Sequence, residues 1–338
     1  PEEIALVEST SHGLNIAARG IELADGDNII TTNLEFIQVA LPWCVMRREK
    51  KIEIRVCKTK DNRFTVDDFA ALADERTRII VMSTLEWCNG WASDMKAIGD
   101  FCQEKGIFLV VDAVQQLGVT KIDTKQCHFD LLVAGGHKWL NSPYGTGVLY
   151  VKNGIQLEPL VYGGGQERGL VSGTENTAGF IGLAAAMQDA CEHLDEKMGY
   201  VKKLTDKLVK GIMENIPYSH YTGDPVNRLP GTASFVFEAI EGEGLILRLD
   251  NAGVCGSTGS ACSTGSLDPS HVLMAIGLPH EIAHGSLRLT LGEQNTEEDV
   301  DYVIETVTDV VKTLRSMSPV WENGKPNLSA AADLTAHH

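Results

Sequence analysis

Short apolar runs alternate with helical patterns along the first half of the sequence, and this alternation is the strongest constraint on its fold. The runs cover residues 29–32, 52–56, 79–83, 108–112, 131–134 and 147–151. Between the third and fourth runs, residues 93–105 carry apolar side chains at helical spacing, and Gly106 follows as a stop signal. This order predicts an α/β fold with a mostly parallel sheet. Ligands of such sheets bind beyond the carboxyl ends of the strands, so residues that follow each run are candidates for chemistry.

The second half has a different texture, which predicts a second domain. A long helical stretch runs from about residue 183 to 210, and prolines follow at 217, 225 and 230. Strand patterns then cover 233–237 and 286–291, and Thr296 begins a capping signal for an amphipathic helix that reaches Met317. Since 338 residues are many for one core, we expect a large domain over 1–190, a small C-terminal domain over 191–326 and a flexible tail over 327–338.

Charge and cysteine content exclude several classes of protein. The net charge of −17 opposes binding to nucleic acid, which requires a basic face. The eight cysteines form no CxxC pair, which argues against a zinc site or any other metal centre and against a disulfide framework. No apolar stretch has membrane-spanning length, and no signal-peptide pattern is present. We therefore expect a cytoplasmic protein that does not bind membranes.

Two strand ends carry the residues of greatest chemical interest. Asp112 ends the run 108–112, and Gln115 lies three residues further on. Taken alone, Asp112 could equally be a turn-forming aspartate. The run 131–134 ends in Gly135-Gly136-His137-Lys138-Trp139, and a lysine beside two glycines and a tryptophan is unusual for a solvated surface charge.

These segments, together with Gly145-Thr146-Gly147, resemble the class V aminotransferase family of fold-type I pyridoxal phosphate (PLP) enzymes. The resemblance continues in three further segments, and the C-terminal half is similar to cysteine desulfurases in particular. Those segments are 162–168 with Ser172-Gly173-Thr174, then Gly259-Ser260-Ala261-Cys262, then 284–288. The resemblance covers about residues 7–321. It implies a fold-type I PLP-transferase with a mostly parallel large domain and a smaller α+β C-terminal domain.

The resemblance implies a role for each residue around the cofactor. Lys138 would hold PLP as a Schiff base and then act as the base that moves the substrate α-proton. Asp112 would keep the pyridine nitrogen protonated, and Gln115 would donate to the phenolic oxygen. Thr10 and Ser11 would receive the phosphate at a helix N-terminus, although a Ser or Thr there is, taken alone, more often a plain helix cap.

Further roles concern the phosphate and the substrate. His137 resembles a phosphate contact, although the residue type alone also fits a histidine packed at the sheet edge. Thr174 resembles the residue that reaches the phosphate of a neighbouring subunit, which implies a homodimer. Arg288 resembles the residue that binds the substrate α-carboxylate through its guanidinium fork, against the alternative of a surface salt bridge. Asn15 is a second candidate for substrate binding.

Cys262 lies in a stretch of small residues, 255–266, that cannot pack a core and is expected to be mobile. In the desulfurases that the chain resembles, such a cysteine attacks the substrate sulfur, leaving L-alanine and an enzyme persulfide. The thiolate is the nucleophile. The resemblance therefore implies an enzyme that takes L-cysteine and passes sulfur from Cys262 to an acceptor, such as an iron–sulfur scaffold. The alternative is an incidental loop thiol.

Three positions depart from the desulfurase pattern. Phe36 stands where a histidine usually stacks on the cofactor, Trp87 replaces an asparagine, and Gly135 replaces a serine expected at the phosphate. A phenylalanine can stack but cannot transfer a proton. Phe36 and Trp87 resemble the isopenicillin-N-epimerase and cystine-lyase branch. Two alternatives follow: another PLP-dependent lyase or epimerase, including a cystine or selenocysteine lyase, or an impaired PLP-binding assembly partner. The family's usual segment ahead of the phosphate-binding helix is expected to be shortened or missing.

Overall fold

The computed structural model describes residues 1–60, 63–258 and 269–327, and it forms two compact units. Unit 1 consists of residues 1–87 and 92–195, and unit 2 consists of residues 88–91 with the described residues from 196 onward. Unit 1 holds β1 (Ile4–Val7), α1 (Thr10–Gly20), β2 (Asn28–Thr32), α2 (Ile37–Met46), β3 (Glu53–Cys57), α3 (Val66–Ala70), β4 (Thr77–Ser83), α4 (Met95–Lys105), β5 (Phe108–Asp112), β6 (Leu131–Gly135), β7 (Gly147–Val151), the short 3-10 helix η1 (Gln166–Gly169) and the start of α5 (Thr177–Asn215).

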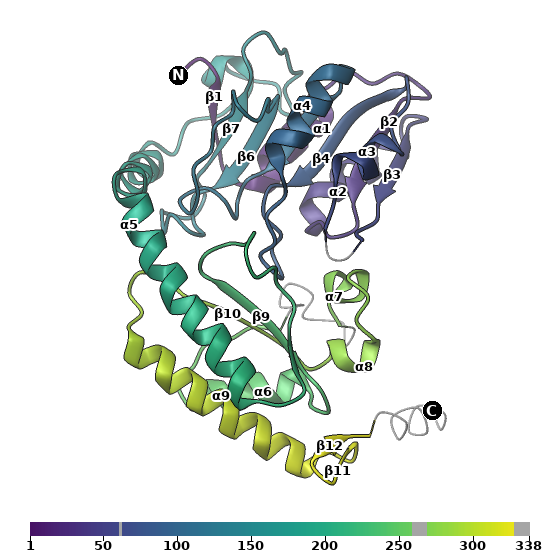
Figure 1. Cartoon of the computed structure of the whole chain (residues 1–338). Coiled ribbons are helices and arrows are strands. Elements are labelled where there is room, and N and C mark those ends of the chain that lie inside the picture. Colours follow the sequence, from purple (N-terminus) through teal and green to yellow (C-terminus); the bar gives the residue numbers. More distant parts are fainter. Residues whose placement is uncertain (61–62, 259–268, 328–338) are drawn as a thin grey trace. The chain divides into compact units, whose positions relative to one another are not determined.

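Unit 1 is built on a seven-stranded sheet in the order β1-β7-β6-β5-β4-β2-β3 (Figure 1). Strands β2 to β6 run parallel, and β7 pairs antiparallel with both β6 and β1. The predicted mostly parallel α/β fold is therefore confirmed. The six strand patterns read from the sequence match β2 to β7 within two residues at each end, whereas β1 was not predicted.

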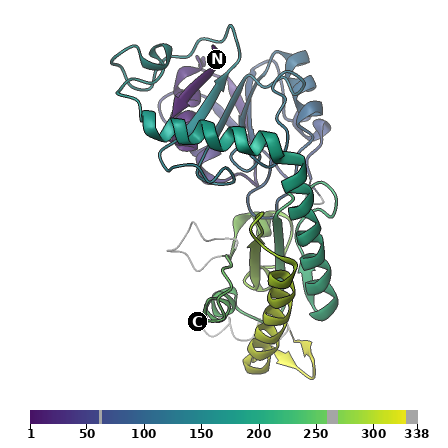
Figure 2. The same ribbon diagram turned by 90° about the vertical axis from the view of Figure 1, so that its left-hand side faces the viewer.

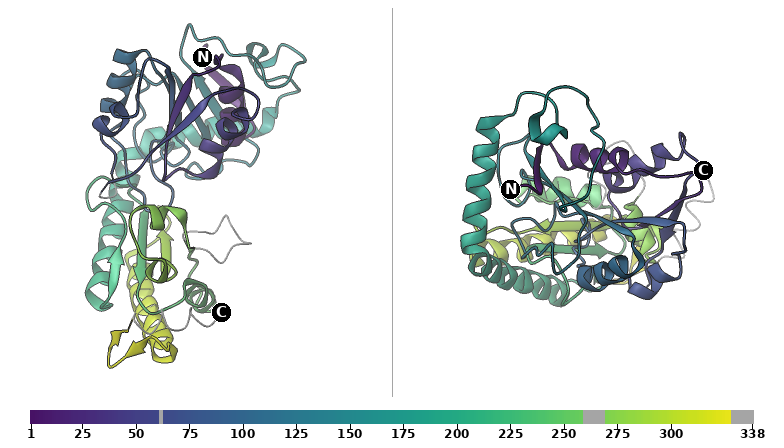
Figure 3. Two further views of the ribbon diagram at one scale, coloured as in Figure 1. Left: turned by 90° about the vertical axis from the view of Figure 1, so that its right-hand side faces the viewer. Right: turned by 90° about the horizontal axis from the view of Figure 1, so that it is seen from above.

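Helices cover both faces of this sheet. In the left view of Figure 3, α1 and α2 lie on one side of the sheet, and α3 and α4 lie on the other. The first face is a continuous apolar core in which Leu14 and Ile16 of α1 and Trp43 of α2 pack with strand residues such as Val133. A Cβ on Gly13 would lie only 2.4 Å from Val133 Cγ1. This glycine therefore lets the first turn of α1 approach the end of β6 closely.

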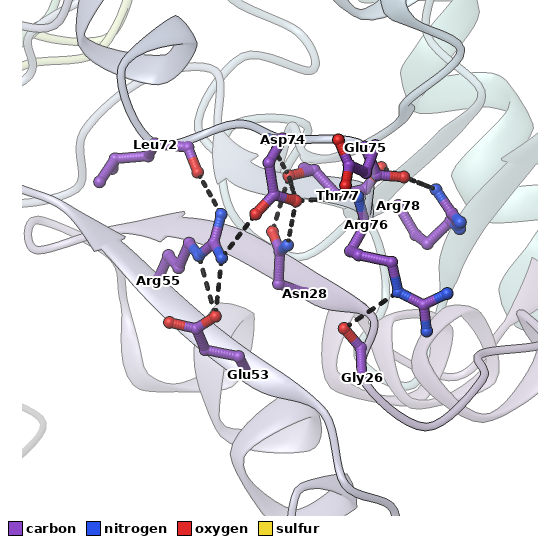
Figure 4. Close-up of polar contacts among 10 residues, drawn as sticks. All are labelled: Gly26, Asn28, Glu53, Arg55, Leu72, Asp74, Glu75, Arg76, Thr77 and Arg78. Atoms are coloured by element: carbon purple, nitrogen blue, oxygen red, sulfur yellow. Dashed lines mark hydrogen bonds and ion pairs between the residues drawn. The ribbon is translucent and has the colours of Figure 1, made fainter.

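The amino ends of β2, β3 and β4 are held together by charged side chains (Figure 4). Arg55 bonds Glu53 Oε2 and Asp74 Oδ2, each at 2.8 Å, and donates to the Leu72 carbonyl at 2.7 Å. Asp74 Oδ1 accepts from Asn28 Nδ2 at 2.8 Å. These bonds join β2, β3 and β4 at their amino ends.

Unit 2 contains a three-stranded antiparallel sheet in the order β10-β9-β8. Its elements are the end of α5, β8 (Ser219–Tyr221), β9 (Thr232–Phe237), α6 (Gly242–Asn251), α7 (His271–Ala275), α8 (His280–Ala283), β10 (Ser286–Thr290), α9 (Glu297–Met317), β11 (Trp321–Glu322) and β12 (Lys325–Pro326). The end of α5 and α9 run side by side (Figure 2). Their apolar side chains, such as Leu208 and Val307, form one core with Phe235 of β9 and Leu287 of β10.

Helix ends in both units follow the predicted signals. Thr296 caps α9 with a reciprocal bond to Asp299, and Gly106 ends α4 in the left-handed conformation with a φ of 67°. No helix in the described ranges is long and apolar enough to cross a membrane. The predicted tail lies outside the described residues, except for Asn327.

Candidate active site

Asp112 is a buried carboxylate at the carboxyl end of β5, near the middle of the sheet. Only 2% of its surface is exposed. Its Oδ1 accepts from the Val114 N–H and its Oδ2 from Gln38 Nε2, both at 2.9 Å. Burial raises the pKa of Asp112, while these two donors and the charge of Lys138 oppose the rise. A cationic partner beside it would favour its ionised form further.

Lys138 follows the carboxyl end of β6, the next strand of the sheet. Its ammonium lies 5.9 Å from the centre of the Phe36 ring. The Phe36 ring in turn meets Trp87 edge to face, with 5.4 Å between ring centres. The departures at positions 36 and 87 thus make a single aromatic wall beside Lys138. The fold brings Lys138 and Asp112 within electrostatic reach of each other from adjacent strands.

A polar cradle lies beside them at the N-terminus of α1. Thr10 is buried, and its hydroxyl has no hydrogen-bond partner in the described structure. A Cβ on Gly135 would lie 3.0 Å from Thr10 Oγ1 and 3.4 Å from His137 Cε1, so the glycine keeps space open between these two side chains. The first backbone N–H groups of a helix lack intrahelical partners and favour anions. The cradle therefore suits a phosphate.

His137 and Gln115 are held by aromatic neighbours. The His137 ring stacks on Tyr144 with 5.6 Å between ring centres. The pKa of His137 is lowered, mainly by partial burial and to a smaller extent by the charge of Lys138. Gln115 Oε1 accepts from Trp139 Nε1 at 2.9 Å. Because this bond holds the amide oxygen, the NH₂ group of Gln115 can donate to a further acceptor.

The side chains of two other predicted residues donate hydrogen bonds to protein groups. Ser11 Oγ donates to Gln38 Oε1 at 2.9 Å, and Asn15 Nδ2 donates to the Ser11 carbonyl at 2.8 Å. Ser11 therefore offers an anion its backbone N–H rather than its hydroxyl proton. The substrate-binding role of Asn15 stays a prediction.

The donors present fit PLP. The unpartnered Thr10 hydroxyl, the space at Gly135 and the N-terminus of α1 would hold its phosphate, Asp112 would face its ring nitrogen, and Lys138 would bind its aldehyde carbon. The family model described as aminotransferase class-V matches residues 1–303.

The chain belongs to the aminotransferase class-V family.

PLP is the cofactor of this family. The chain is 42% identical over 331 residues to cysteine desulfurase IscS of Clostridium botulinum, covering 96% of this chain and 83% of that protein. It is 40% identical over 270 residues to cysteine desulfurase NifS of Azotobacter vinelandii, covering 79% and 66%. A solved structure of a NifS-like protein superposes with a TM-score of 0.84 at 28% identity, covering 93% of this chain and 84% of that one.

Three further predicted residues of this class-V chain come from other segments of the sequence. Thr174 is exposed in unit 1 after η1. Arg288 lies on β10 of unit 2, where Leu287 and Leu289 are buried on the opposite face as the alternation predicted. Cys262 lies outside the described residues. The roles of these three residues stay predictions.

Two site residues were missed by the sequence reading. Glu35, just before Phe36, is buried and accepts from Ser83 Oγ at 2.6 Å, from the Ser83 N–H at 2.9 Å and from Thr32 Oγ1 at 2.7 Å. Burial raises its pKa to about 7, and the nearby Asp112 adds to the rise. Gln38 is the other. Its signal was a lone polar residue in the otherwise apolar segment Ile37–Met46.

Proposed function

We propose that this protein is a PLP-dependent cysteine desulfurase that converts L-cysteine to L-alanine and carries the sulfur as a persulfide on Cys262. The observation that supports it most is the meeting of Lys138, Asp112 and the Thr10 cradle at the carboxyl ends of adjacent strands. The relatives that share this family are named cysteine desulfurases. Together they specify the cofactor and the class of reaction.

Each residue of the cluster has one task in this reaction. Bound PLP withdraws electrons from the substrate Cα. Lys138 would anchor the cofactor, and its amine is the base that would take the substrate α-proton. Asp112 stabilises positive charge on the ring nitrogen because it is a carboxylate held in a site of low dielectric. Outside this cluster, the role proposed for Arg288 is to bind the substrate carboxylate as a planar, bidentate partner.

Cys262 takes the sulfur. Its thiolate attacks the sulfur of the bound cysteine, the C–S bond breaks, and the electrons of that bond return to the carbon that becomes the methyl group of alanine. The balance is one L-cysteine and one enzyme thiol converted to one L-alanine and one enzyme persulfide. A thiol acceptor, such as an iron–sulfur cluster scaffold, then removes the outer sulfur.

The assembly is proposed to be a cytoplasmic homodimer. Thr174 is exposed beside η1, in a segment that includes exposed Tyr162, where a neighbouring subunit would place its PLP phosphate. The homodimer follows from the implied role of Thr174, and the cytoplasm from the reduced state expected of the scattered cysteines.

Alanine formation from L-cysteine, measured with and without reductant, tests the proposal. Cys262→Ser should abolish sulfur transfer and reduce alanine formation by about 10²-fold or more, while wild type should turn over repeatedly only with reductant. Cys255→Ser is the matched control, because Cys255 is an exposed cysteine seven positions earlier, and it should keep full activity.

A lyase or epimerase is the second candidate, and the aromatic wall of Phe36 and Trp87 favours it because neither ring can transfer a proton to sulfur. In that reaction Cys262 has no role. Undiminished alanine formation by Cys262→Ser would contradict the desulfurase mechanism. Turnover of L-cystine or racemisation of an amino acid by the same variant would then assign the second function.

A further inference from the structure

Gln38 connects the two ends of the expected cofactor site. It lies in the first turn of α2, and its amide donates to Asp112 Oδ2 at 2.9 Å and accepts from Ser11 Oγ at 2.9 Å. Ser11 belongs to the first turn of α1, beside the phosphate cradle. A single side chain therefore spans from the anion-binding helix to the carboxylate that faces the ring nitrogen.

The direction of both bonds follows from the chemistry of the partners. An ionised carboxylate can only accept hydrogen bonds, so the amide NH₂ group must face Asp112. The amide oxygen then faces Ser11, which must donate its hydroxyl proton. Gln38 therefore cannot turn over without placing its oxygen against the carboxylate. The arrangement fixes the orientation of all three side chains.

The charged groups around Asp112 make a neutral donor important. Glu35 reaches the same region from the loop after β2, and the nearby Asp112 carboxylate disfavours its ionisation. Lys138 acts from the end of β6 as the opposing positive charge. When the lysine amine is engaged with a cofactor, the N–H groups of Gln38 and Val114 remain as fixed donors to Asp112.

We propose that Gln38 is a positioning residue, which holds the Asp112 carboxylate ionised and aimed at the ring nitrogen of PLP and couples it to Ser11 at the phosphate end. This role rests on the proposed function. Through Gln38, α2 would help to keep the ring nitrogen of the cofactor protonated, a role that the motif Gly135-Gly136-His137-Lys138 does not supply.

The test compares Gln38→Leu and Gln38→Glu with wild type in PLP-loaded protein. The first readout is the chemical shift of an isotopically labelled pyridine nitrogen against pH, which reports whether that nitrogen is protonated. In Gln38→Leu the donor to Asp112 is lost, so Asp112 should take up its proton at a pH about one unit higher than in wild type. The chemical shift of the pyridine nitrogen should change at that same pH, because the nitrogen then loses its ionised partner. Gln38→Glu should raise that pH further, because a second carboxylate opposes ionisation of Asp112. The PLP dissociation constant should rise by up to about tenfold.

Two comparisons separate positioning from a loss of folding. Gln188→Leu removes a similar bond, from an amide to the Glu192 carboxylate at 2.8 Å on an exposed part of α5, and should leave the titration unchanged. Ser11→Ala should shift the titration slightly in wild type and add nothing in Gln38→Leu, since Ser11 reaches Asp112 through Gln38.

Two results would overturn the inference in distinguishable ways. If wild type bound PLP on Lys138 but both Gln38 variants titrated as wild type does, Gln38 would have no positioning role, and the desulfurase proposal would stand. If wild type bound no PLP, both the proposed function and this role would be wrong.

Discussion

The two ends of the unit 1 sheet treat their carboxylates in opposite ways. At the amino ends, Asp74 is paired with Arg55 at 2.8 Å, and hydrogen bonds, first from Arg55, lower its pKa to about 2. At the carboxyl ends, Asp112 and Glu35 are buried and held mainly by neutral donors, and burial raises the pKa of both.

The difference separates structure from chemistry. A carboxylate matched by an arginine stabilises the fold and has little affinity left for a new partner. A buried carboxylate with few compensating charges costs stability, and such groups cluster at functional sites. The carboxyl ends are therefore poised to receive a cation, whereas the amino ends already hold theirs.

The largest expected effect comes from Lys138→Ala, which removes both the anchor and the base from the carboxyl ends. Alanine formation from L-cysteine should fall by at least about 10³-fold, and the visible absorbance of the lysine-bound cofactor should disappear. Lys152→Ala is the matched control. Lys152 lies beside the amino end of β6, because β7 runs antiparallel to that strand, and it pairs with Asp130 at 2.9 Å. Equal losses in the two variants would erase the distinction between the ends.

Asp112→Asn should lower activity by about 10²- to 10³-fold, since an amide cannot keep the ring nitrogen charged. Asp74→Asn makes the same chemical change at the amino end of β4 and should leave the catalytic rate intact while lowering thermal stability. Steady-state assays and melting curves of the two variants give the comparison. A full-rate Asp112→Asn enzyme would refute the assignment of Asp112.

Glu35→Gln should change how stability depends on pH. The pKa of Glu35 rises from 4.5 to about 7 on folding, so the folded state binds the extra proton, and wild type loses stability as pH rises through this window. A rise of the pKa from 4.5 to about 7 corresponds to about 3 kcal/mol. The free energy of unfolding of the variant should therefore rise by about 3 kcal/mol relative to that of wild type between about pH 4 and about pH 8. Denaturant unfolding of both proteins over this pH range measures the difference. An unchanged difference would show that Glu35 titrates normally.

Arg55→Ala should have the smallest effect. It breaks the bonds to Glu53, Asp74 and the Leu72 carbonyl, but the pairs are partly exposed, and exposed pairs contribute little. The midpoint of thermal unfolding should fall by about 2 °C, with kcat and KM unchanged. A loss of turnover in this variant would mean that the amino ends also serve catalysis.

The sequence predicted the features of the molecule that depend on short-range pattern. Buried strands such as Phe108–Asp112 appear as apolar runs because helices cover both faces of the sheet, and their last residues mark the site. Lys138 and Asp112 were found in this way. Strand β1 was not predicted because its four residues are too few to show a strand pattern of alternating side chains. Its partner β7 lies about 140 residues away in the sequence.

Contacts between distant side chains could not be predicted. Nothing near Gln38 in the sequence indicates that it meets Ser11 and Asp112, because this contact depends on how α1 and α2 pack on the same face of the sheet. The inclusion of residues 88–91 in unit 2 is likewise a property of the fold, since these residues lie in the connection between β4 and α4, which both belong to unit 1.

Borohydride reduction of the PLP-loaded protein, followed by peptide mass spectrometry, tests the central claim most directly. Reduction fixes the cofactor on whichever amine holds it. The pyridoxyl group should be found on Lys138, at close to one per chain, and should be absent from Lys152 at the opposite end of the sheet. Modification of a different lysine, or none at all, would contradict a cofactor site at the carboxyl ends.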